Sequence, residues 1–359
     1  MQALDRLRRW RTDGTPPSVA PPELRRWWRT LQQGRLPEAV DAAPALAGRL
    51  AAEEATRGWV PAVVLATGAV LAGQERNLEA RQHLREGLAM LPGTPSTDLV
   101  GDGSWHALVL VELCLLTGEP AEAAARVDPL TLPDRPVEVR LGAARAQARL
   151  RQATGDFEGA HWLLHTATDL AAATRSHLLE TVVEADRAVL LARQGRTHEA
   201  VRVADGAVEP LSRPGQGPHA VLALGQAAAT AASVARVCAA TGDTLSAARL
   251  VGDAHRAADR SGRRLPRAGA LLAEAATHRA LGDLAAADAA AEAASRLAAE
   301  LAAAPVEALA RYEAGCAAVA AGRLASARPV LARAATELRR TGQPVDAAEV
   351  ERLLAQLPI

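Results

Sequence analysis

Small and apolar side chains recur at helical spacing along this chain of 359 residues, in segments that short glycine-containing turns separate. One such segment turns at Gly155 and continues with small or apolar residues at steps of three or four positions: Phe157, Ala160, Leu164 and Ala167. Side chains at this spacing lie along one face of an α-helix. The segment is therefore predicted to form two helices that pack against each other across the turn.

The same arrangement repeats through the whole chain. Turns with a glycine, each followed by an alanine five residues later, lie at Gly34, Gly118, Gly155, Gly195, Gly242, Gly282 and Gly322, and a looser version lies at Gly73. Successive turns are 37 to 47 residues apart. A period near 40 residues is typical of stacked helical repeats, in which each unit contacts its neighbours. The sequence therefore predicts an all-α solenoid of about eight helix pairs with short helices at its ends.

Three parts of the chain are expected. Residues 1–22 form a short helix and a proline-rich linker, residues 23–341 form the helix pairs, and residues 342–359 form a C-terminal capping helix. The turn after Gly73 carries two extra residues before its alanine, Ala80.

The composition agrees with closely packed helices and excludes several classes of enzyme. The chain holds 86 alanines and only 8 aromatic residues, which favours helix-on-helix packing over a large β-sheet. All 41 basic residues are arginine. Without lysine there is no Walker-A lysine, no ATP-binding lysine of the protein-kinase type and no Schiff-base nucleophile.

Charge and cysteine usage indicate partners and compartment. The 41 acidic residues balance the 41 arginines, so no overall field favours nucleic acid or an anionic membrane. The three cysteines are far apart and form no CxxC pair, which is typical of reduced, buried thiols. The chain begins without an apolar signal core and has no long uncharged apolar run, so we expect a cytoplasmic protein.

The helix pairs resemble tetratricopeptide repeats, in which a turn glycine is followed by a large residue, an alanine, and small residues one and two turns later. The last pair carries this pattern in Gly322, Leu324, Ala327, Leu331 and Ala334. An additional glycine of its first helix, at position 315, also lies where the family prefers glycine. The resemblance covers all the helix pairs and implies a right-handed superhelix with a concave groove that binds a peptide or protein segment.

The period is longer than the roughly 34 residues of a tetratricopeptide repeat. In this respect, and in the segment SAARLVGDAH at 246–255, the chain is similar to the repeat regions of large bacterial transcriptional activators of the LuxR and maltose-regulator types. Those activators also carry an ATPase and a DNA-binding domain, but this sequence has no P-loop and no helix-turn-helix within 1–22. The similarity is therefore limited to the repeats.

The tetratricopeptide resemblance also implies which side chains face the groove, namely those 13, 10, 6 and 3 residues before a turn glycine. In the third and fourth pairs these positions hold Trp105, Leu108, Glu112 and Leu115, followed by Gly142, Arg145, Arg149 and Gln152. Later pairs contribute Arg236, Arg279, Leu309, Tyr312, Cys316 and Val319.

An apolar patch around Trp105 is thus expected beside a row of arginines. Guanidinium groups bind carboxylate or phosphate through two parallel hydrogen bonds, so an extended peptide with acidic groups or an amphiphilic anion would fit. Alternatively, the arginines are paired with acidic residues one helical turn away. Partners for such pairs are available in Glu112, Glu184, Asp186, Glu274 and Glu313.

Other candidate sites are less specific. His161 and His165 lie four residues apart on one helix face, as zinc ligands do, but the sequence offers no third ligand. Trp162 beside them is expected to pack between repeats. Trp27 and Trp28 either cover the first repeat or mark a partner surface. No Gly-x-Ser-x-Gly motif, cysteine–histidine dyad or distinctive carboxylate pair indicates catalysis.

The predicted function is a non-catalytic binding scaffold, without a cofactor, that holds a peptide or protein segment in its groove. One alternative is a stand-alone sensor of a small-molecule effector, and another is an atypical enzyme built on the solenoid. A scaffold needs an open cleft with rows of polar side chains, whereas a sensor needs a closed, apolar pocket with a few anchoring groups. A homodimer through the first repeats or the C-terminal helix is compatible with either function.

Overall fold

The computed structural model describes residues 20–94, 96–213 and 218–358, and all regular secondary structure within these ranges is helical. The helices form eight consecutive pairs, as the period predicts. The first helices of the pairs are α2 (Pro22–Gln32), α5 (Val60–Gly73), α8 (Ser104–Thr117), α10 (Val137–Thr154), α12 (His177–Arg193), α14 (Pro218–Ala240), α16 (Arg264–Ala280) and α18 (Ala304–Ala320). The second helices are α3 (Leu36–Ala52), α6 (Asn77–Met90), α9 (Pro120–Val127), α11 (Phe157–Ala173), α13 (Thr197–Ser212), α15 (Thr244–Ser261), α17 (Leu284–Glu300) and α19 (Leu324–Arg340).

Short elements join or end these pairs: α4 (Glu54–Arg57), α7 (Thr97–Val100), the 3-10 helix η1 (Asp128–Leu130) and the C-terminal helix α20 (Pro344–Gln356). Helix α20 packs on α19, where Ala347 and Val350 are buried with Leu331 and Leu338. The predicted all-α, right-handed solenoid of helix pairs is confirmed. The short helix and linker expected before residue 20 lie outside the described residues.

The turns within the pairs place one residue in the left-handed backbone region. The glycines at the seven regular turns have φ between +72° and +84°, a conformation that glycine adopts without strain. The second pair differs, because Gly73 is the last residue of α5 and the left-handed position belongs to Glu75, with φ of +60°. Ala80 follows Glu75 by five residues, like the alanines after the other turns. The turn residue of the second pair is therefore Glu75, and the prediction of a turn at Gly73 was wrong.

Small residues allow the helices to approach closely. The alanines five residues past the turns are buried, with at most 1% of each exposed: Ala39, Ala80, Ala123, Ala160, Ala200, Ala247, Ala287 and Ala327. Gly315 of α18 packs so closely on α19 that a Cβ there would lie 2.5 Å from Leu331 Cδ2. Trp27 and Trp28 are also buried, and Trp27 Nε1 donates a hydrogen bond of 2.7 Å to Ala39 O. These tryptophans cover the first repeat and do not form an exposed partner surface.

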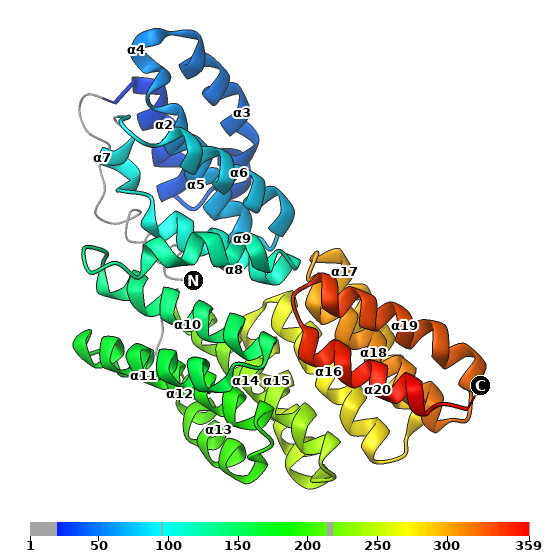
Figure 1. Cartoon of the computed structure of the whole chain (residues 1–359). Helices are drawn as coiled ribbons and strands as arrows, with labels where there is room; N and C mark the ends of the chain where they lie inside the picture. The colour runs from blue at the N-terminus through cyan, green and yellow to red at the C-terminus, as the bar shows by residue number, and fades with distance from the viewer. Residues whose placement is uncertain (1–19, 95, 214–217, 359) are drawn as a thin grey trace.

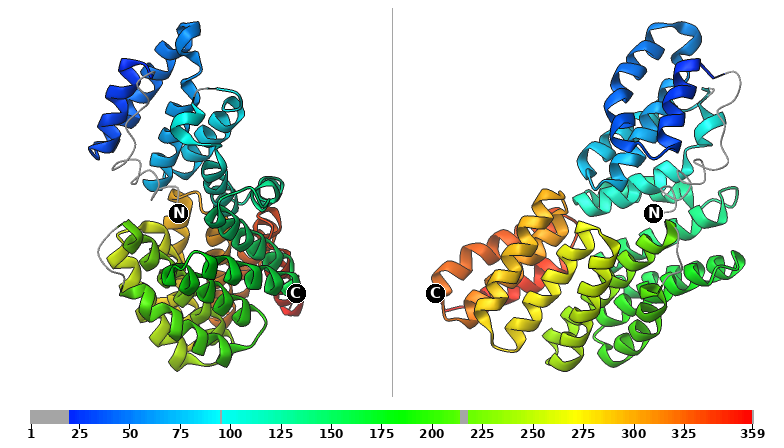
Figure 2. Two further views of the ribbon diagram at one scale, coloured as in Figure 1. Left: turned by 90° about the vertical axis from the view of Figure 1, so that its left-hand side faces the viewer. Right: turned by 180° about the vertical axis from the view of Figure 1, so that it is seen from behind.

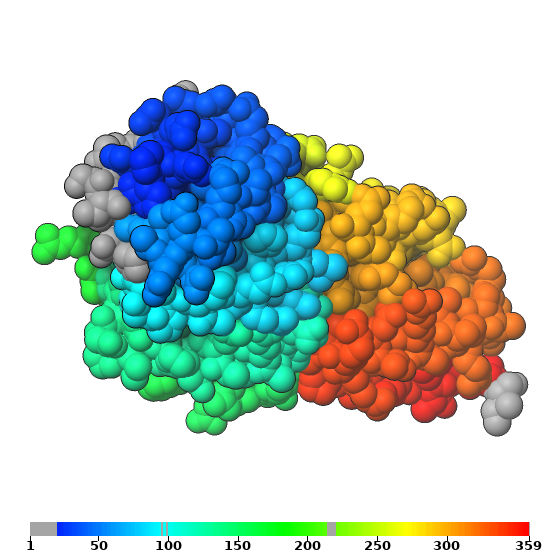
Figure 3. Space-filling model, turned by 90° about the horizontal axis from the view of Figure 1, so that it is seen from above, coloured from blue at the N-terminus to red at the C-terminus, as the bar shows by residue number. Residues whose placement is uncertain are grey.

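The solenoid curves until its last repeats contact its second and third repeats. The N-terminal helices, α2 to α6, project from a body that the later helices form (Figures 1 and 2). Seen from above, the second and third pairs adjoin the last two pairs (Figure 3). We call this contact the seam. Its early side consists of Glu75, Asn77, Leu116, Gly118 and Pro120, and its late side of residues 263–265 with Leu301, Thr341 and Gly342.

Two segments, Glu54–Gly73 and Ala220–Ala240, are long and apolar enough to cross a membrane by length and composition alone. In this fold they belong to the packed interior, where 67% and 61% of their apolar stretches are buried. Burial between neighbouring repeats accounts for this composition.

The close packing at Gly315 leads to a prediction about the free energy of unfolding. We expect Gly315→Val to lower the free energy of unfolding by about 1–3 kcal/mol, because the added methyl groups overlap with Leu331. The matched control is Gly206→Ala in α13, where an added Cβ meets no atom within 4 Å. That control should stabilise the protein by roughly 0.5–1 kcal/mol through helix propensity. Urea unfolding followed by circular dichroism measures both, and a shift of the same sign in the two variants would contradict the packing argument.

Candidate ligand cavity

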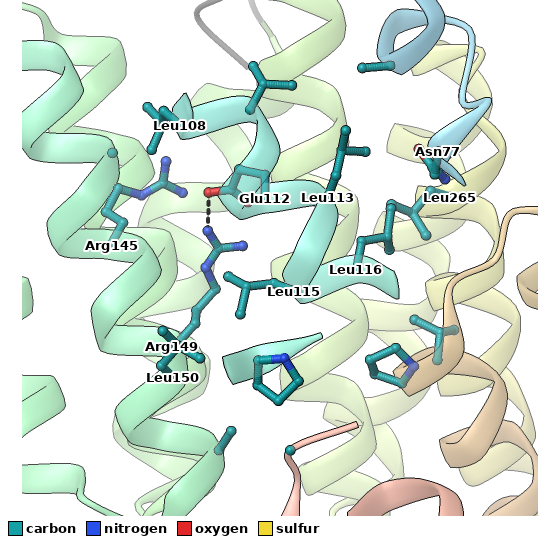
Figure 4. Close-up of a pocket in the computed structure, with 18 of the residues that line it drawn as sticks. Asn77, Leu108, Glu112, Leu113, Leu115, Leu116, Arg145, Arg149, Leu150 and Leu265 are labelled. Carbon is teal, nitrogen blue, oxygen red and sulfur yellow. Dashed lines mark hydrogen bonds and ion pairs between the residues drawn. The ribbon is translucent and has the colours of Figure 1, made fainter. Parts of the chain in front are cut away.

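A cavity of about 480 Å³ lies where the inner faces of the first helices converge. Helix α8 supplies more of its apolar wall than any other helix, through Leu108, Val109, Leu113, Leu115 and Leu116. Figure 4 shows α8 in the centre of this wall, with α10 on one side and Leu265 of α16 on the other. A cavity of this size accommodates a small organic ligand or a few residues of a peptide.

Several residues that the resemblance placed in the groove line this cavity together: Leu108, Glu112, Leu115, Gly142, Arg145 and Arg149. They come from α8 and α10 and follow the spacing of one helix face. The two helices touch where Gly142 packs on Leu108, since a Cβ on Gly142 would lie 2.5 Å from Leu108 Cδ2. The inner faces of the third and fourth pairs thus form one continuous wall.

Glu112 of α8 and Arg149 of α10 form an ion pair in this wall (Figure 4). A third of the Glu112 side chain and 39% of the Arg149 side chain remain accessible, and this surface faces the cavity, because both residues line it. Burial raises the pKa of Glu112, but the charge and the hydrogen bond of Arg149, together with more distant positive charges such as Arg145, outweigh this effect and hold the pKa below its ordinary value. Arg149 Nε has no hydrogen-bond partner among the described residues. The same nitrogen has almost no accessible surface, so it does not offer a donor to the cavity.

A second charged group of the wall, Arg145, links three consecutive first helices. Its Nε donates to Asp186 of α12, and one of its terminal nitrogens donates to Gln226 Oε1 of α14 at 3.3 Å. Gln226 Nε2 in turn donates to Asp186 Oδ1 at 3.0 Å. Arg145 and Arg149 are therefore both paired with acidic residues, as the alternative interpretation held. Their partners lie on neighbouring helices, however, and not one turn away on the same helix.

The remaining groove candidates lie outside this cavity. Trp105 and Gln152 are buried, with 6% and 5% exposed, in the packing around α8 and α10. Arg236 and Arg279 instead converge on Glu313 of α18, at 3.8 and 3.0 Å.

Tyr312, the last groove candidate, lies next to Glu313 in the sequence. Its hydroxyl donates to Glu349 Oε1 of α20 at 3.2 Å, and burial raises its pKa. Arg236, Arg279 and Tyr312 thus belong to a polar cluster on the later repeats, bridging α14, α16, α18 and α20. The cluster is separate from the cavity beside α8.

The seam forms another wall of the cavity, and the sequence did not indicate this wall. This wall consists of Glu75, Asn77, Arg263, Leu265, Pro305, Val306, Thr341, Gly342 and Gln343. Its two sides are about 190 to 220 positions apart in the chain, so no local spacing could pair them. The irregular second turn and the single asparagine of the chain, Asn77, were the available signals.

The histidine pair lies on the outer surface of α11. His165 Nδ1 is 3.5 Å from Asp169 Oδ2, and no set of three or more His, Cys, Asp or Glu among the described residues could hold a metal ion. Trp162 beside them is 68% exposed, so the expectation that it packs between repeats was wrong. The three cysteines are buried, and burial raises the pKa of Cys114 and Cys316 to about 12. Thiols with such pKa values are poor nucleophiles at neutral pH.

Comparison with known proteins identifies the fold. No family model and no curated protein matches the sequence. Among solved structures, the chain is similar to a Rap protein in the crystal structure of its complex with Competence and Sporulation Factor. The two share 13% sequence identity over 92% of this chain and 84% of that chain, with a TM-score of 0.56. The chain therefore has a tetratricopeptide-like helical-repeat fold. Similarity to the LuxR-type and maltose-regulator activators stays a prediction.

The ion pair in the cavity wall makes a prediction about stability. Removing one partner, as in Arg149→Met, should cost about 1–3 kcal/mol at pH 7, because the Glu112 carboxylate stays in the wall without its counter-charge. The double variant Glu112→Leu/Arg149→Met should recover most of this loss. Urea unfolding of the wild type, of the single variants Glu112→Leu and Arg149→Met, and of the double variant gives the coupling free energy. Additive effects of the two single changes would show that the pair is not coupled.

The same pair makes a prediction about pH. The pKa of Glu112 in the folded protein lies below its ordinary value of 4.5, so its contribution to stability is complete above pH 4.5 and is lost as the pH falls through the lowered value. In Arg149→Met burial remains while the charge and hydrogen bond that lower the pKa most are gone, so the pKa of Glu112 should rise. The stability difference between wild type and variant should then be largest near neutral pH and shrink on acidification. Urea midpoints at pH 7, 5 and 3.5 test this, and a constant difference would refute it.

Proposed function

We propose that this protein is a non-catalytic binding scaffold that holds a short peptide or protein segment in the cavity beside α8. The observation that carries the proposal is the convergence of predicted groove residues from α8 and α10 on one partly apolar cavity. The Rap protein of similar fold was solved in complex with Competence and Sporulation Factor, so a fold of this kind supports binding of a factor. A cytoplasmic location is part of the proposal.

The wall suggests the chemistry of the ligand. Its leucines suit an apolar body, and its ionisable side chains, Glu75, Glu112, Arg145, Arg149 and Arg263, are held in ion pairs. The accessible part of the Arg149 side chain adds a cationic site for an acceptor atom. A peptide meets both needs, since it offers apolar side chains together with backbone carbonyl or carboxylate oxygens. We therefore propose a ligand with an apolar body and at least one acidic or carbonyl group at Arg149.

A second candidate function is the sensing of a small-molecule effector. It is favoured by the volume of the cavity, which lies in the usual range for small-ligand sites, and by its predominantly apolar lining. An enzymatic activity gains little support, because the ionisable groups of the wall are engaged with one another and none is placed as a free nucleophile or base.

Native mass spectrometry of the protein purified from its own cells distinguishes these functions. We expect a bound peptide or protein that is lost from the variant Arg145→Ala/Arg149→Ala, because that change removes the two cationic side chains that α10 contributes to the wall. A retained small molecule would instead favour the sensor and reveal its chemical class. Recovery of the wild-type protein without any bound species, at concentrations where the complex is expected, would count against both.

The matched control is Arg140→Ala/Arg151→Ala, which removes two arginines of the same helix that do not line the cavity. This control should keep the ligand. Circular dichroism establishes that both variants remain helical. Equal retention of the ligand by the two double variants would show that it binds elsewhere on the protein.

A further inference from the structure

The seam is built on an unusual helix cap. The N-cap residue of α16, Arg263, supplies no side-chain hydrogen bond to its own helix. The cap comes from Glu75, whose two carboxylate oxygens accept the backbone N–H of Arg264 at 2.9 Å and of Leu265 at 3.2 Å. Arg263 Nε also lies 3.3 Å from the same carboxylate. A carboxylate at a helix N-terminus satisfies otherwise unpaired donors and interacts favourably with the helix dipole. Glu75 thus caps a helix that begins 189 positions later in the chain.

Glu75 holds this position at a conformational cost. The corresponding turn residue of the other pairs is glycine, whereas Glu75 adopts φ of +60° with a full side chain. A side chain in the left-handed region is strained, because its Cβ crowds the following carbonyl oxygen, and such strain persists where surrounding contacts determine it. The side chain is only 10% exposed, so its contacts across the seam are largely shielded from water. The contacts with α16 explain why a glutamate occupies a glycine position.

The rest of the seam is also specific. Asn77 is 5% exposed and donates from Nδ2 to Leu301 O at 2.7 Å. Leu116 packs with Leu301 in an apolar cluster that joins α8 to the end of α17. Gly118 lies against Thr341, where a Cβ would be 2.6 Å from Thr341 Cγ2, so the third turn fits closely against the end of α19. These contacts bring one edge of the early repeats against one edge of the late repeats.

The seam also forms a wall of the candidate ligand cavity, opposite the Glu112–Arg149 pair on α8 and α10. Glu75, Asn77 and Leu265 line the cavity as well as the seam. A ligand that fills the cavity therefore touches both edges only while the seam is closed. Each helix pair keeps its own packing with its neighbours if the seam opens, because a solenoid is stabilised by neighbour contacts. Opening the seam therefore enlarges the cavity without separating the two helices of any pair.

We propose that the seam is a movable wall of the cavity, that Glu75 is the positioning residue that latches it, and that ligand binding and seam closure stabilise each other. This inference rests on the proposed function, since it takes the cavity as the ligand site. It goes further by assigning the regulation of that site to Glu75, Asn77 and the start of α16. A ligand that contacts both edges binds the closed state more tightly, and by linkage it favours closure by the same factor.

Hydrogen exchange tests the latch without any ligand. In Glu75→Gln, the amides of Arg264 and Leu265 should exchange roughly tenfold to a hundredfold faster than in the wild type, because the charge-assisted cap is lost. Glu75→Gly should show the same loss although it removes the backbone strain. The matched control is Glu79→Gln. Glu79 is an acidic residue in the first turn of α6, and it pairs with Arg76 outside the seam. Unchanged exchange in both Glu75 variants would overturn the latch.

Binding of the fluorescent probe 1-anilinonaphthalene-8-sulfonate, which has apolar rings and one anionic group, tests the coupling. The probe should slow hydrogen exchange at Arg264 and Leu265 in the wild type. Glu75→Gln should bind the probe more weakly, by at most the ratio of the closed-seam population in the wild type to that in the variant. The affinity of Glu79→Gln should be unchanged. Faster exchange in Glu75→Gln with unaltered probe affinity would overturn the coupling but not the ligand site.

Failure of the proposed ligand site and failure of the Glu75 latch give different results. If neither the wild type nor Glu75→Gly binds the probe, or if binding is unaffected by Arg149→Met, the cavity is not a site for such a ligand and the proposed function fails. Hydrogen exchange still decides whether Glu75 latches the seam. Circular dichroism of each variant confirms that its helices remain, so that faster exchange reports opening of the seam and not general unfolding.

Discussion

Close approach of helices at alanine and glycine positions is the constraint on which the rest of this structure depends. An alanine five residues past each turn is buried, and Gly315 and Gly142 leave no room for a Cβ against their leucine neighbours. Small side chains reduce the separation between packed helices, and the separations on the two faces of each repeat set the curvature of the array. The curvature in turn brings repeats two and three against repeats seven and eight, which creates both the seam and the cavity.

Charge is placed in the interior only where this curvature gives it partners. Arg145 meets Asp186 and Gln226 from the next two first helices, and Arg149 meets Glu112 from the preceding one. A buried charge without a partner would cost several kcal/mol, so these residues tie the angle between consecutive repeats to the pairing of charges. The cavity is therefore polar at defined points of an otherwise apolar wall. This arrangement suits selection of a ligand by the position of its acceptor atoms.

Local information in the sequence was enough for the repeats and for half of the cavity. Helix pairs follow from apolar spacing and turn glycines, and the wall formed by Leu108, Glu112 and Arg149 follows from the face that the first helices turn inward. The partners of the arginines were misplaced because each pair lies between helices and not along one. The seam could not be predicted, since contact between residues 75 and 264 depends on the summed curvature of five repeats. Small errors in each repeat accumulate in such a sum.

In the second turn, a glutamate occupies a position where the other turns have glycine, and a contact with the distant helix α16 explains it. Glycine would satisfy the turn geometry there without strain, as it does in seven other turns, so the glutamate contributes nothing to the turn itself. Its carboxylate accepts hydrogen bonds from two amides at the start of α16 and forms an ion pair with the guanidinium of Arg263. Charge-assisted hydrogen bonds to a helix start stabilise by about as much as the strain costs, or somewhat more. The Glu75 contact therefore adds only a small net stabilisation to a seam that Asn77, Leu116 and Gly118 also hold, and a contribution of this size is one that a bound ligand can match.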